Sequence, residues 1–269
     1  MARWQPVVRD ARYRKRRSAG FPVAISEGDS WFDYPFFLNI IDLIEDAELF
    51  AHYRLEQSGD TVKSMIGTAT GVLNLRLIVE QVQPLCVLFS GGGNDMADAA
   101  GTLFRPGRDS DPLSCVNRTA VRALLDMIDE RYRVLVDRIG PIAPVMAHGY
   151  DYFAPSPADV RFNGVGIGVG PWIHPAMVEQ GIVAADTQRA IARWLVDEFN
   201  LVLERVQQDH PTSFVFVDLR DTLDIDADWE NEIHPTRAGF RKVAAVFIAE
   251  IRSRLPDIIH ARVLDRLIA

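Results

Sequence analysis

The sequence predicts a single α/β domain, a three-layer α/β/α sandwich built on a mainly parallel five-stranded sheet. Two observations favour this class: short apolar runs without the alternation of half-exposed strands, and longer segments between them with helical periodicity. The 269 residues, of which 48% are hydrophobic, suffice for one substantial core. We therefore expect strands that are buried on both faces, with helices above and below the sheet.

Five apolar runs are the expected strands, and polar or glycine-containing loops bound them. The clearest are 21–26, which leads into Glu-Gly-Asp-Ser, and 85–89, which leads into Ser-Gly-Gly-Gly-Asn-Asp. The other expected strands are 49–55, 144–147 and 213–219. Apolar residues at helical spacing predict helices over 61–83 with an interruption near Gly67 and Gly71, and over 113–139, 185–208 and 236–254.

Two segments stand apart from this regular pattern. Residues 1–20 form a basic arm in front of the domain 21–269, with seven Lys or Arg and one Asp. They contribute +6 to a formal charge of −8, which leaves about −14 on the rest of the chain. We expect the arm to be a solvated leader, with contact to an acidic partner or lipid as the alternative. Residues 151–183 are rich in Pro and Gly, include the run 164–170, and indicate a long inserted loop.

Composition and missing motifs exclude several classes. The acidic body argues against a nucleic-acid partner, and no apolar run approaches the roughly 18 residues of a membrane span. Without a secretion signal we expect a cytoplasmic protein, in which Cys86 and Cys115 are free thiols. The glycine loop 91–96 lacks the last glycine of the dinucleotide-binding motif GxGxxG, and no glycine loop is followed by the GK[ST] of a phosphate-binding P-loop. The GxSxG motif of classical α/β-hydrolases does not occur. No spacing predicts a metal site, so we expect no metal and no cofactor. The oligomeric state is left open.

Four short blocks occur in order along the chain: Gly28-Asp29-Ser30, Ser58-Gly59-Asp60-Thr61, Gly92-Gly93-Asn94-Asp95 and His234-Pro235. In order and spacing they resemble the conserved blocks of the SGNH/GDSL hydrolase superfamily, the GDSL-like lipases and acylhydrolases. The resemblance covers most of the chain. It implies a flavodoxin-like SGNH fold and a serine esterase that acts on a small-molecule ester.

The resemblance also implies a role for particular residues. Ser30 would be the nucleophile and His234 the general base, since a serine hydroxyl attacks well only when an imidazole takes its proton. The oxyanion donors would be the backbone N–H groups of Ser30 and Gly59 and the side-chain amide of Asn94, each worth on the order of 3 kcal/mol of barrier.

The third member of the expected triad departs from the family pattern. The family usually has Asp three residues before the catalytic His, where this chain has Asn231. Asn231 or a backbone carbonyl could orient the ring by accepting a hydrogen bond from Nδ1. The neighbouring carboxylates of Asp228, Glu230 and Glu232 are further candidates.

Further residues are expected near the cleft: Asp29, Gly92, Asp95, His148, Trp172 and His174. For Asp29 and Asp95 we favour a structural role in capping helices or tying loops. The inserted loop is interpreted either as a lid or acyl pocket or as a rigid excursion. The predicted activity is hydrolysis of small to medium acyl esters through an acyl-enzyme on Ser30. The alternatives are a non-catalytic binding protein of the same fold and an O-acyltransferase.

Overall fold

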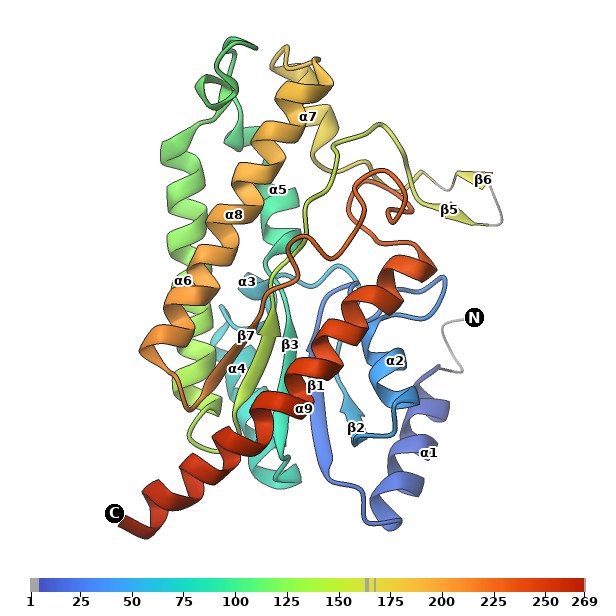
Figure 1. The fold of residues 1–269 in the computed structure, drawn as a ribbon, viewed down its shortest axis with the longest axis vertical. Helices are drawn as coiled ribbons and strands as arrows, with labels where there is room; N and C mark the ends of the chain where they lie inside the picture. The colour runs from blue at the N-terminus through green and yellow to red at the C-terminus, as the bar shows by residue number, and fades with distance from the viewer. Residues whose placement is uncertain (1–4, 163–164, 167, 269) are drawn as a thin grey trace.

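The predicted α/β class is confirmed by the computed structural model, which describes residues 5–162, 165–166 and 168–268. One sheet holds five strands, all parallel: β1 (Val23–Gly28), β2 (Ala51–Arg54), β3 (Cys86–Ser90), β4 (Val145–His148) and β7 (Phe214–Val217). Their order is β2-β1-β3-β4-β7 (Figure 1). This is the flavodoxin-like order, in which the chain changes direction across the sheet between β1 and β3.

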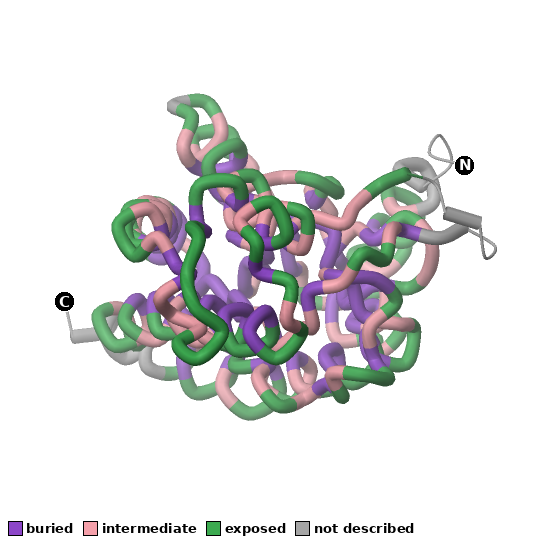
Figure 2. The backbone as a smooth tube through the Cα atoms, turned by 90° about the horizontal axis from the view of Figure 1, so that it is seen from above, coloured by how far each residue is buried: buried purple, intermediate pink, exposed green. Residues whose placement is uncertain are grey.

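The strands are apolar throughout because both faces of the sheet are covered. In β3, Val87 and Phe89 pack into one hydrophobic cluster, whereas Cys86 and Leu88 pack into the other. The first cluster lies under α3 (Val62–Met65), α4 (Ala69–Val82), α5 (Gly93–Leu103), α6 (Arg118–Ile139) and α8 (Ala185–Asp209). The second lies under α2 (Ile40–Asp46) and α9 (Arg237–Ile268). Seen from above, the buried segments lie mainly toward the centre and the exposed ones around them (Figure 2).

Each predicted strand is present, with ends that differ by about two residues at most. The helices differ more. The segment expected at 113–139 divides into a 3₁₀ turn, Pro112–Cys115, and α6, and α9 continues past residue 254 through Pro256. Helix α2 was not predicted, although Asn39 and Asp42 form a capping box at its start.

The basic arm does not form a solvated leader over residues 5–18. These residues form helix α1 (Gln5–Ser18), which packs against β2 (Figure 1). Arg9 and Arg12 bind acidic side chains of the same chain, Asp33 at 2.5 Å and Glu45 at 2.8 Å. Two of the basic side chains of the arm therefore form ion pairs with carboxylates of the domain itself. Residues 1–4 lie outside the described part.

The inserted segment 151–183 contains some regular structure. It carries a two-stranded antiparallel hairpin, β5 (Arg161–Phe162) and β6 (Val165–Gly166), and the short helix α7 (His174–Glu179). The hairpin stands out from the body at the upper right of Figure 1. Of the glycine-rich run 164–170, residues 164 and 167 lie outside the described part.

Two further expectations concern thiols and membranes. Cys86 and Cys115 are free and buried. Among the described helices, none combines the length and the apolar composition needed to cross a bilayer.

Candidate functional site

The residues singled out by motif meet at the carboxyl ends of the strands. Ser30 follows β1, Asn94 lies in the first turn of α5 just after β3, and His234 lies in the loop before α9. In sheets of this topology, ligands bind where the strand order reverses, which is the position between β1 and β3. The site therefore lies where the fold itself predicts a crevice.

Ser30, His234 and Asn231 form a continuous hydrogen-bonded chain. Ser30 Oγ lies 2.7 Å from His234 Nε2, and His234 Nδ1 lies 2.9 Å from Asn231 Oδ1. All three residues are buried. Asn231 Oδ1 also accepts the backbone N–H groups of Ile233 and His234, at 3.2 and 3.1 Å. This oxygen is thus an acceptor, so Nδ1 carries the ring proton and Nε2 is left free to accept from the serine.

The loop around His234 is held by backbone contacts. The Glu230 N–H donates to the carbonyl of His234 at 2.9 Å, which closes the loop on itself. Trp31 Nε1, next to the nucleophile, donates to the carbonyl of Ile233 at 3.0 Å. The loop that carries His234 is therefore tied to the turn that carries Ser30.

The environment of His234 keeps its ring neutral. Burial lowers the pKa of His234 to about 3, because an imidazolium would lose its hydration there. The ring of Tyr34 lies 4.6 Å from it and the ring of Trp172 lies 5.3 Å from it, centroid to centroid. The Tyr34 hydroxyl accepts from Asn231 Nδ2 at 3.3 Å. Aromatic rings and one amide surround the base.

Of the three alternative carboxylates, Glu230 is exposed and the other two are engaged elsewhere. Asp228 accepts from the backbone N–H of Asp224 at 2.8 Å and from Lys242 Nζ at 2.5 Å. Glu232 binds three successive backbone N–H groups, those of residues 172–174, at 2.5, 2.8 and 2.6 Å. Of the candidates raised from the sequence, Asn231 is the one whose side chain contacts Nδ1.

Glu232 also has a role that the sequence did not suggest. Burial raises its pKa, while the backbone N–H groups it accepts act in the opposite direction. By holding residues 172–174, it fixes the position of Trp172, whose ring edge meets His234. The inserted segment is thereby joined to the loop of the base.

Of the residues expected to donate to an oxyanion, Ser30 and Asn94 line one cavity. Gly59 has φ of +90°, a left-handed conformation that favours glycine. Asn94 Nδ2 donates one N–H to the carbonyl of Asp60 at 2.8 Å, which holds the amide beside the Gly59 turn. An amide nitrogen carries two N–H groups, so this contact uses one of them.

Asp29 stabilises the turn that presents Ser30. Its carboxylate accepts from the Trp31 N–H at 3.0 Å, the Ser90 hydroxyl at 2.7 Å and the Tyr150 hydroxyl at 2.5 Å. Next to this turn, a Cβ on Gly28 would lie 2.7 Å from Ser90, so β1 and β3 approach too closely for a side chain. The carboxylate is part of the support of the turn.

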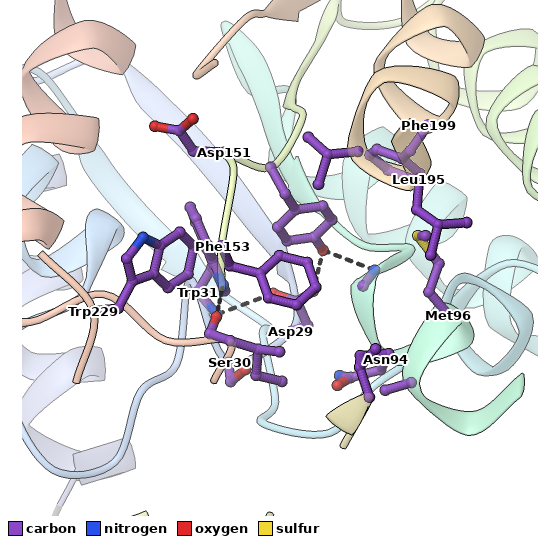
Figure 3. Close-up of a pocket in the computed structure, with 16 residues that line it drawn as sticks. Asp29, Ser30, Trp31, Asn94, Met96, Asp151, Phe153, Leu195, Phe199 and Trp229 are labelled. Carbon is purple, nitrogen blue, oxygen red and sulfur yellow. Dashed lines mark hydrogen bonds between the residues drawn. The ribbon is translucent and has the colours of Figure 1, made fainter. Parts of the chain in front are cut away.

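A small cavity opens beside the nucleophile (Figure 3). Its volume is about 60 Å³, and its lining comes from the Ser30 turn, α5, the start of the inserted segment, α8 and the loop before α9. The polar groups Ser30 and Asn94 meet apolar walls there. The apolar residues are Trp31, Met96, Ala97, Phe153, Ile173, Leu195, Val196, Phe199, Trp229 and Ile233. His234 is not among the lining residues.

Of the residues expected at the cleft, Asp29 lines this cavity and the others lie elsewhere. Gly92 precedes α5 with φ of +113° and packs under the Phe199 ring, where a Cβ would come within 2.4 Å. Asp95 accepts the backbone N–H groups of Val62 and Lys63, at 2.8 and 3.2 Å, at the start of α3. This is the kind of structural role expected for it.

The two further histidines expected near the cleft, His148 and His174, do not line the cavity either. His148 is fully buried, with its ring nitrogens 2.9 Å from Ser90 Oγ and 2.6 Å from the Gly149 carbonyl. His174 begins α7, where its backbone N–H binds Glu232. Trp172 contacts the base without lining the cavity. Over the described residues, no group of three or more His, Cys, Asp or Glu is arranged to hold a metal ion.

Comparisons with known proteins find distant likenesses. No protein-family model and no curated protein matches this chain. A solved structure of a lipolytic G-D-S-L family member from Veillonella parvula is 15% identical, with a TM-score of 0.48, over 86% of this chain and 98% of that one. The N-terminal part of a Bacteroides fragilis protein, containing a phosphatase domain complexed with Mg, is 13% identical with a TM-score of 0.47. That match covers 91% of this chain, which spans 57% of the length of the other.

Proposed function

We propose that this protein is a serine ester hydrolase in which Ser30 forms an acyl-enzyme and His234 is the general base. The observation that carries the proposal is the 2.7 Å contact between Ser30 Oγ and His234 Nε2, with Nδ1 held on the opposite side of the ring. A hydroxyl, a neutral imidazole and an orienting acceptor in this order are what nucleophilic acyl transfer requires.

The first half of the reaction forms the acyl-enzyme. His234 Nε2 takes the proton of Ser30 as Oγ attacks the ester carbonyl carbon, and the carbonyl oxygen becomes an oxyanion. The N–H groups of Ser30, Gly59 and Asn94 stabilise this oxyanion. The tetrahedral intermediate then collapses: the bond to the alkoxy oxygen breaks, and this oxygen takes the proton from Nε2 and leaves as the alcohol.

The second half repeats these steps with water in place of the serine. His234 Nε2 takes a proton from water, the hydroxyl attacks the acyl carbon, and Ser30 Oγ leaves with the proton returned by Nε2. The products are a carboxylic acid and free enzyme, and no further reactant is needed.

Asn231 gives this chemistry a particular character. An amide oxygen fixes the tautomer and direction of the imidazole, as a carboxylate would, without adding a negative charge. The imidazolium formed during each transfer is therefore stabilised by a dipole alone, and the resting base keeps its low pKa. The cavity beside Ser30 has neither Lys nor Arg among its lining residues. This supports a neutral ester in preference to a phosphate ester.

Labelling with a fluorophosphonate probe tests the proposal. The probe is expected to modify the wild type at Ser30, mapped by mass spectrometry, and to leave Ser30→Ala and His234→Ala unmodified. Ser213→Ala is the matched control, because Ser213 lies at the opposite end of the sheet, before β7; its labelling should equal that of the wild type. Labelling at another residue, or none with the wild type, would contradict the proposal.

A further inference from the structure

The cavity beside Ser30 receives one particular part of an ester. An ester carbonyl carbon at Ser30 Oγ carries two groups besides its oxygen: the acyl chain and the alkoxy group. The alkoxy oxygen must reach His234 Nε2, which returns a proton to it. His234 lies outside the lining of the cavity, whereas Ser30 and Asn94 belong to it. With the alkoxy group directed toward His234, the cavity is left for the acyl chain.

The carboxylates of the cavity wall, Asp29 and Asp151, are already engaged. Asp29 accepts three hydrogen bonds, including one from Tyr150, whose hydroxyl in turn accepts from the Gly93 N–H at 3.1 Å. Asp151 accepts from the backbone N–H groups of residues 152 and 221–223, at 2.6 to 2.9 Å. The walls therefore hold no free charge to pair with a charged chain, and burying an unpaired charge is costly.

One donor of the lining is without a partner among the described residues. It is the indole Nε1 of Trp229. Figure 3 shows this nitrogen on the side of the ring that is turned away from Phe153. The face that Trp229 presents to Phe153 is carbon, so the acyl chain meets an apolar surface there as well.

The volume of the cavity limits the length of the chain. A buried apolar cavity of about 150 Å³ accepts the six carbons of benzene, so the 60 Å³ beside Ser30 holds about two to three carbons in proportion. Leu195 and Met96 lie across the cavity from Ser30 and Trp229 (Figure 3). Leu195 is 2% exposed, which makes it a fixed end wall.

We infer that the site selects esters of short, uncharged acyl groups, with two to three carbons beyond the carbonyl, which are propionyl and butyryl esters. The inference rests on the proposed function and specifies its substrate class. The mouth of the cavity holds the reacting groups, and its far wall sets the chain length.

The chain-length profile of the wild type is the first test. The test compares kcat/KM for p-nitrophenyl acetate, propionate, butyrate, hexanoate and octanoate. From acetate to butyrate it should rise about fourfold for each CH₂ that becomes buried. Beyond butyrate it should fall by about tenfold or more, because a filled cavity resists extra methylenes. A profile that keeps rising to octanoate would overturn the inference.

A charged probe of the same length tests the apolar walls. The p-nitrophenyl monoester of succinic acid has a four-carbon acyl chain like butyrate but ends in a carboxylate. Its kcat/KM should be about a hundredfold below that of butyrate, since the carboxylate finds no cation in the cavity. Equal rates for the two esters would contradict the inference.

Two variants should move the profile in opposite directions. Leu195→Ala opens the far wall and should raise the hexanoate-to-butyrate ratio about tenfold, while Ala97→Leu fills the cavity and should lower the butyrate-to-acetate ratio by about as much. Leu203→Ala is the matched control, because Leu203 is a buried leucine of α8 outside the lining. It should lose stability as Leu195→Ala does and keep the wild-type profile.

The outcomes separate this inference from the proposed function. Fluorophosphonate labelling at Ser30 together with a profile that Leu195→Ala and Ala97→Leu leave unchanged would overturn the acyl-chain assignment alone. Absence of both labelling and ester turnover in the wild type would overturn the proposed function itself.

Discussion

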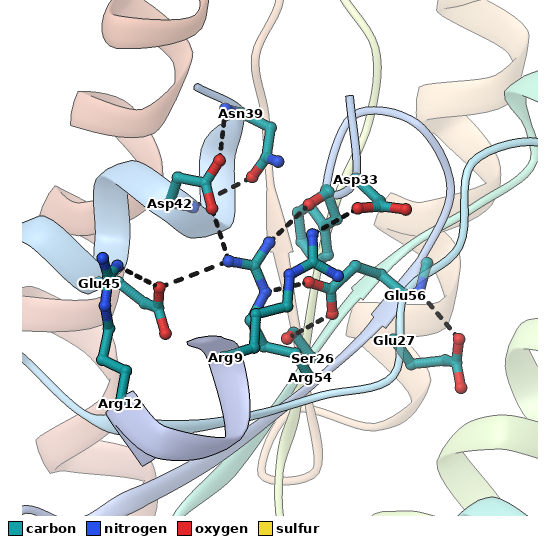
Figure 4. Close-up of polar contacts among 12 residues, drawn as sticks. Arg9, Arg12, Ser26, Glu27, Asp33, Asn39, Asp42, Glu45, Arg54 and Glu56 are labelled. Atoms are coloured by element: carbon teal, nitrogen blue, oxygen red, sulfur yellow. Dashed lines mark hydrogen bonds and ion pairs between the residues drawn. The ribbon is translucent and has the colours of Figure 1, made fainter. Parts of the chain in front are cut away.

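Two clusters of polar side chains lie beside strand β1, and they differ in charge: one contains ion pairs and the other only neutral groups. The first surrounds Arg54 of β2, whose side chain is 2% exposed and binds the carboxylates of Asp42 at 2.5 Å, Glu45 at 3.4 Å and Glu56 (Figure 4). Glu56 also accepts from the hydroxyl of Ser26 in β1 at 2.7 Å. These ion pairs and this hydrogen bond join β1, β2 and α2.

The second cluster is the chain Ser30–His234–Asn231, and no member of it is a carboxylate. Burial lowers the pKa of His234 to about 3, so a neutral ring rests between two neutral partners. Around Arg54, by contrast, ionisable groups are buried together and each carboxylate has a cation or hydrogen-bond donor, while burial raises the pKa of Glu56. Paired charges thus stabilise the fold around Arg54, whereas under the proposed function the neutral polar groups around His234 stabilise a charge that forms only during the reaction.

The largest expected effect comes from removing the base. His234→Ala should lower kcat/KM for p-nitrophenyl butyrate by about 10⁴-fold, because Ser30 loses its proton acceptor. Its thermal midpoint should also fall, because the change leaves a cavity at a buried position, so kcat/KM is compared per folded molecule. His210→Ala, at the end of α8, is the control with wild-type kinetics. Retention of a tenth of the activity would show that His234 is not the base.

Removing the central charge of the other cluster should act on stability instead. Arg54→Met leaves the carboxylates of Asp42, Glu45 and Glu56 without their shared cation and should cost about 3–5 kcal/mol of unfolding free energy. Urea unfolding measures this loss. Arg122→Met breaks an exposed pair with Asp126 and should cost less than about 1 kcal/mol. If activity per folded molecule also fell sharply in Arg54→Met, the two clusters would not be independent.

Glu232 tests whether the inserted segment supports the base. In Glu232→Gln, the amide NH₂ would replace one of the two oxygens that accept the backbone N–H groups of residues 172–174. A donor would then face a donor, and Trp172 would be held less firmly. Misplacement of Trp172 against His234 should lower kcat about 10- to 100-fold with little change in KM. Steady-state kinetics measure kcat and KM separately. An unchanged kcat would show that Glu232 contributes to the stability of the fold and not to the position of His234.

The smallest effect concerns pH and the charge at position 231. With a His234 pKa of about 3, the base is neutral throughout pH 5–8, and wild-type kcat/KM should be flat there. Asn231→Asp adds a carboxylate beside Nδ1, raises the pKa of His234 and should lower kcat/KM at pH 5 relative to pH 8 by about tenfold. A wild-type profile that falls below pH 7 would show that the ring is protonated at rest.

The same pKa has a consequence for stability. The unfolded chain binds a proton on this histidine near its ordinary pKa of 6.5, whereas the folded chain does so only near 3. The stability that follows from the neutral ring is therefore complete above pH 6.5 and is lost as the pH falls toward 3. Buried His52, whose pKa burial also lowers to about 3, acts in the same direction.

The strands could be predicted from sequence because burial on both faces leaves an uninterrupted apolar run, as in Val87–Phe89 of β3. Helix α5 could not, because it begins after the N-cap Gly92, which has no side chain to form a cap and packs against Phe199, 107 positions later. Local patterns do not contain such contacts.

The site shows the same limit. Ser30, Asn94 and His234 stand in recognisable blocks, so they could be selected in advance. Tyr34 could not be selected, and Glu232 was a candidate only as a partner of His234, since their observed roles depend on rings and backbone N–H groups that meet only after folding. The spacing already places Asn231 three residues before His234. Its contact with Nδ1 could be identified only from the structure, in which Asp228 and Glu232 bind other groups.

Helix α1 has a consequence for how the protein can be trimmed. It packs against β2, the outermost strand, with the ring of Tyr13 on that of Tyr53 at 5.3 Å. A chain shortened to begin at residue 21 would lack Arg9, Arg12 and this cover. The bare strand edge would then offer its backbone to the edge of another copy, and such a shortened protein should self-associate more strongly than the full chain.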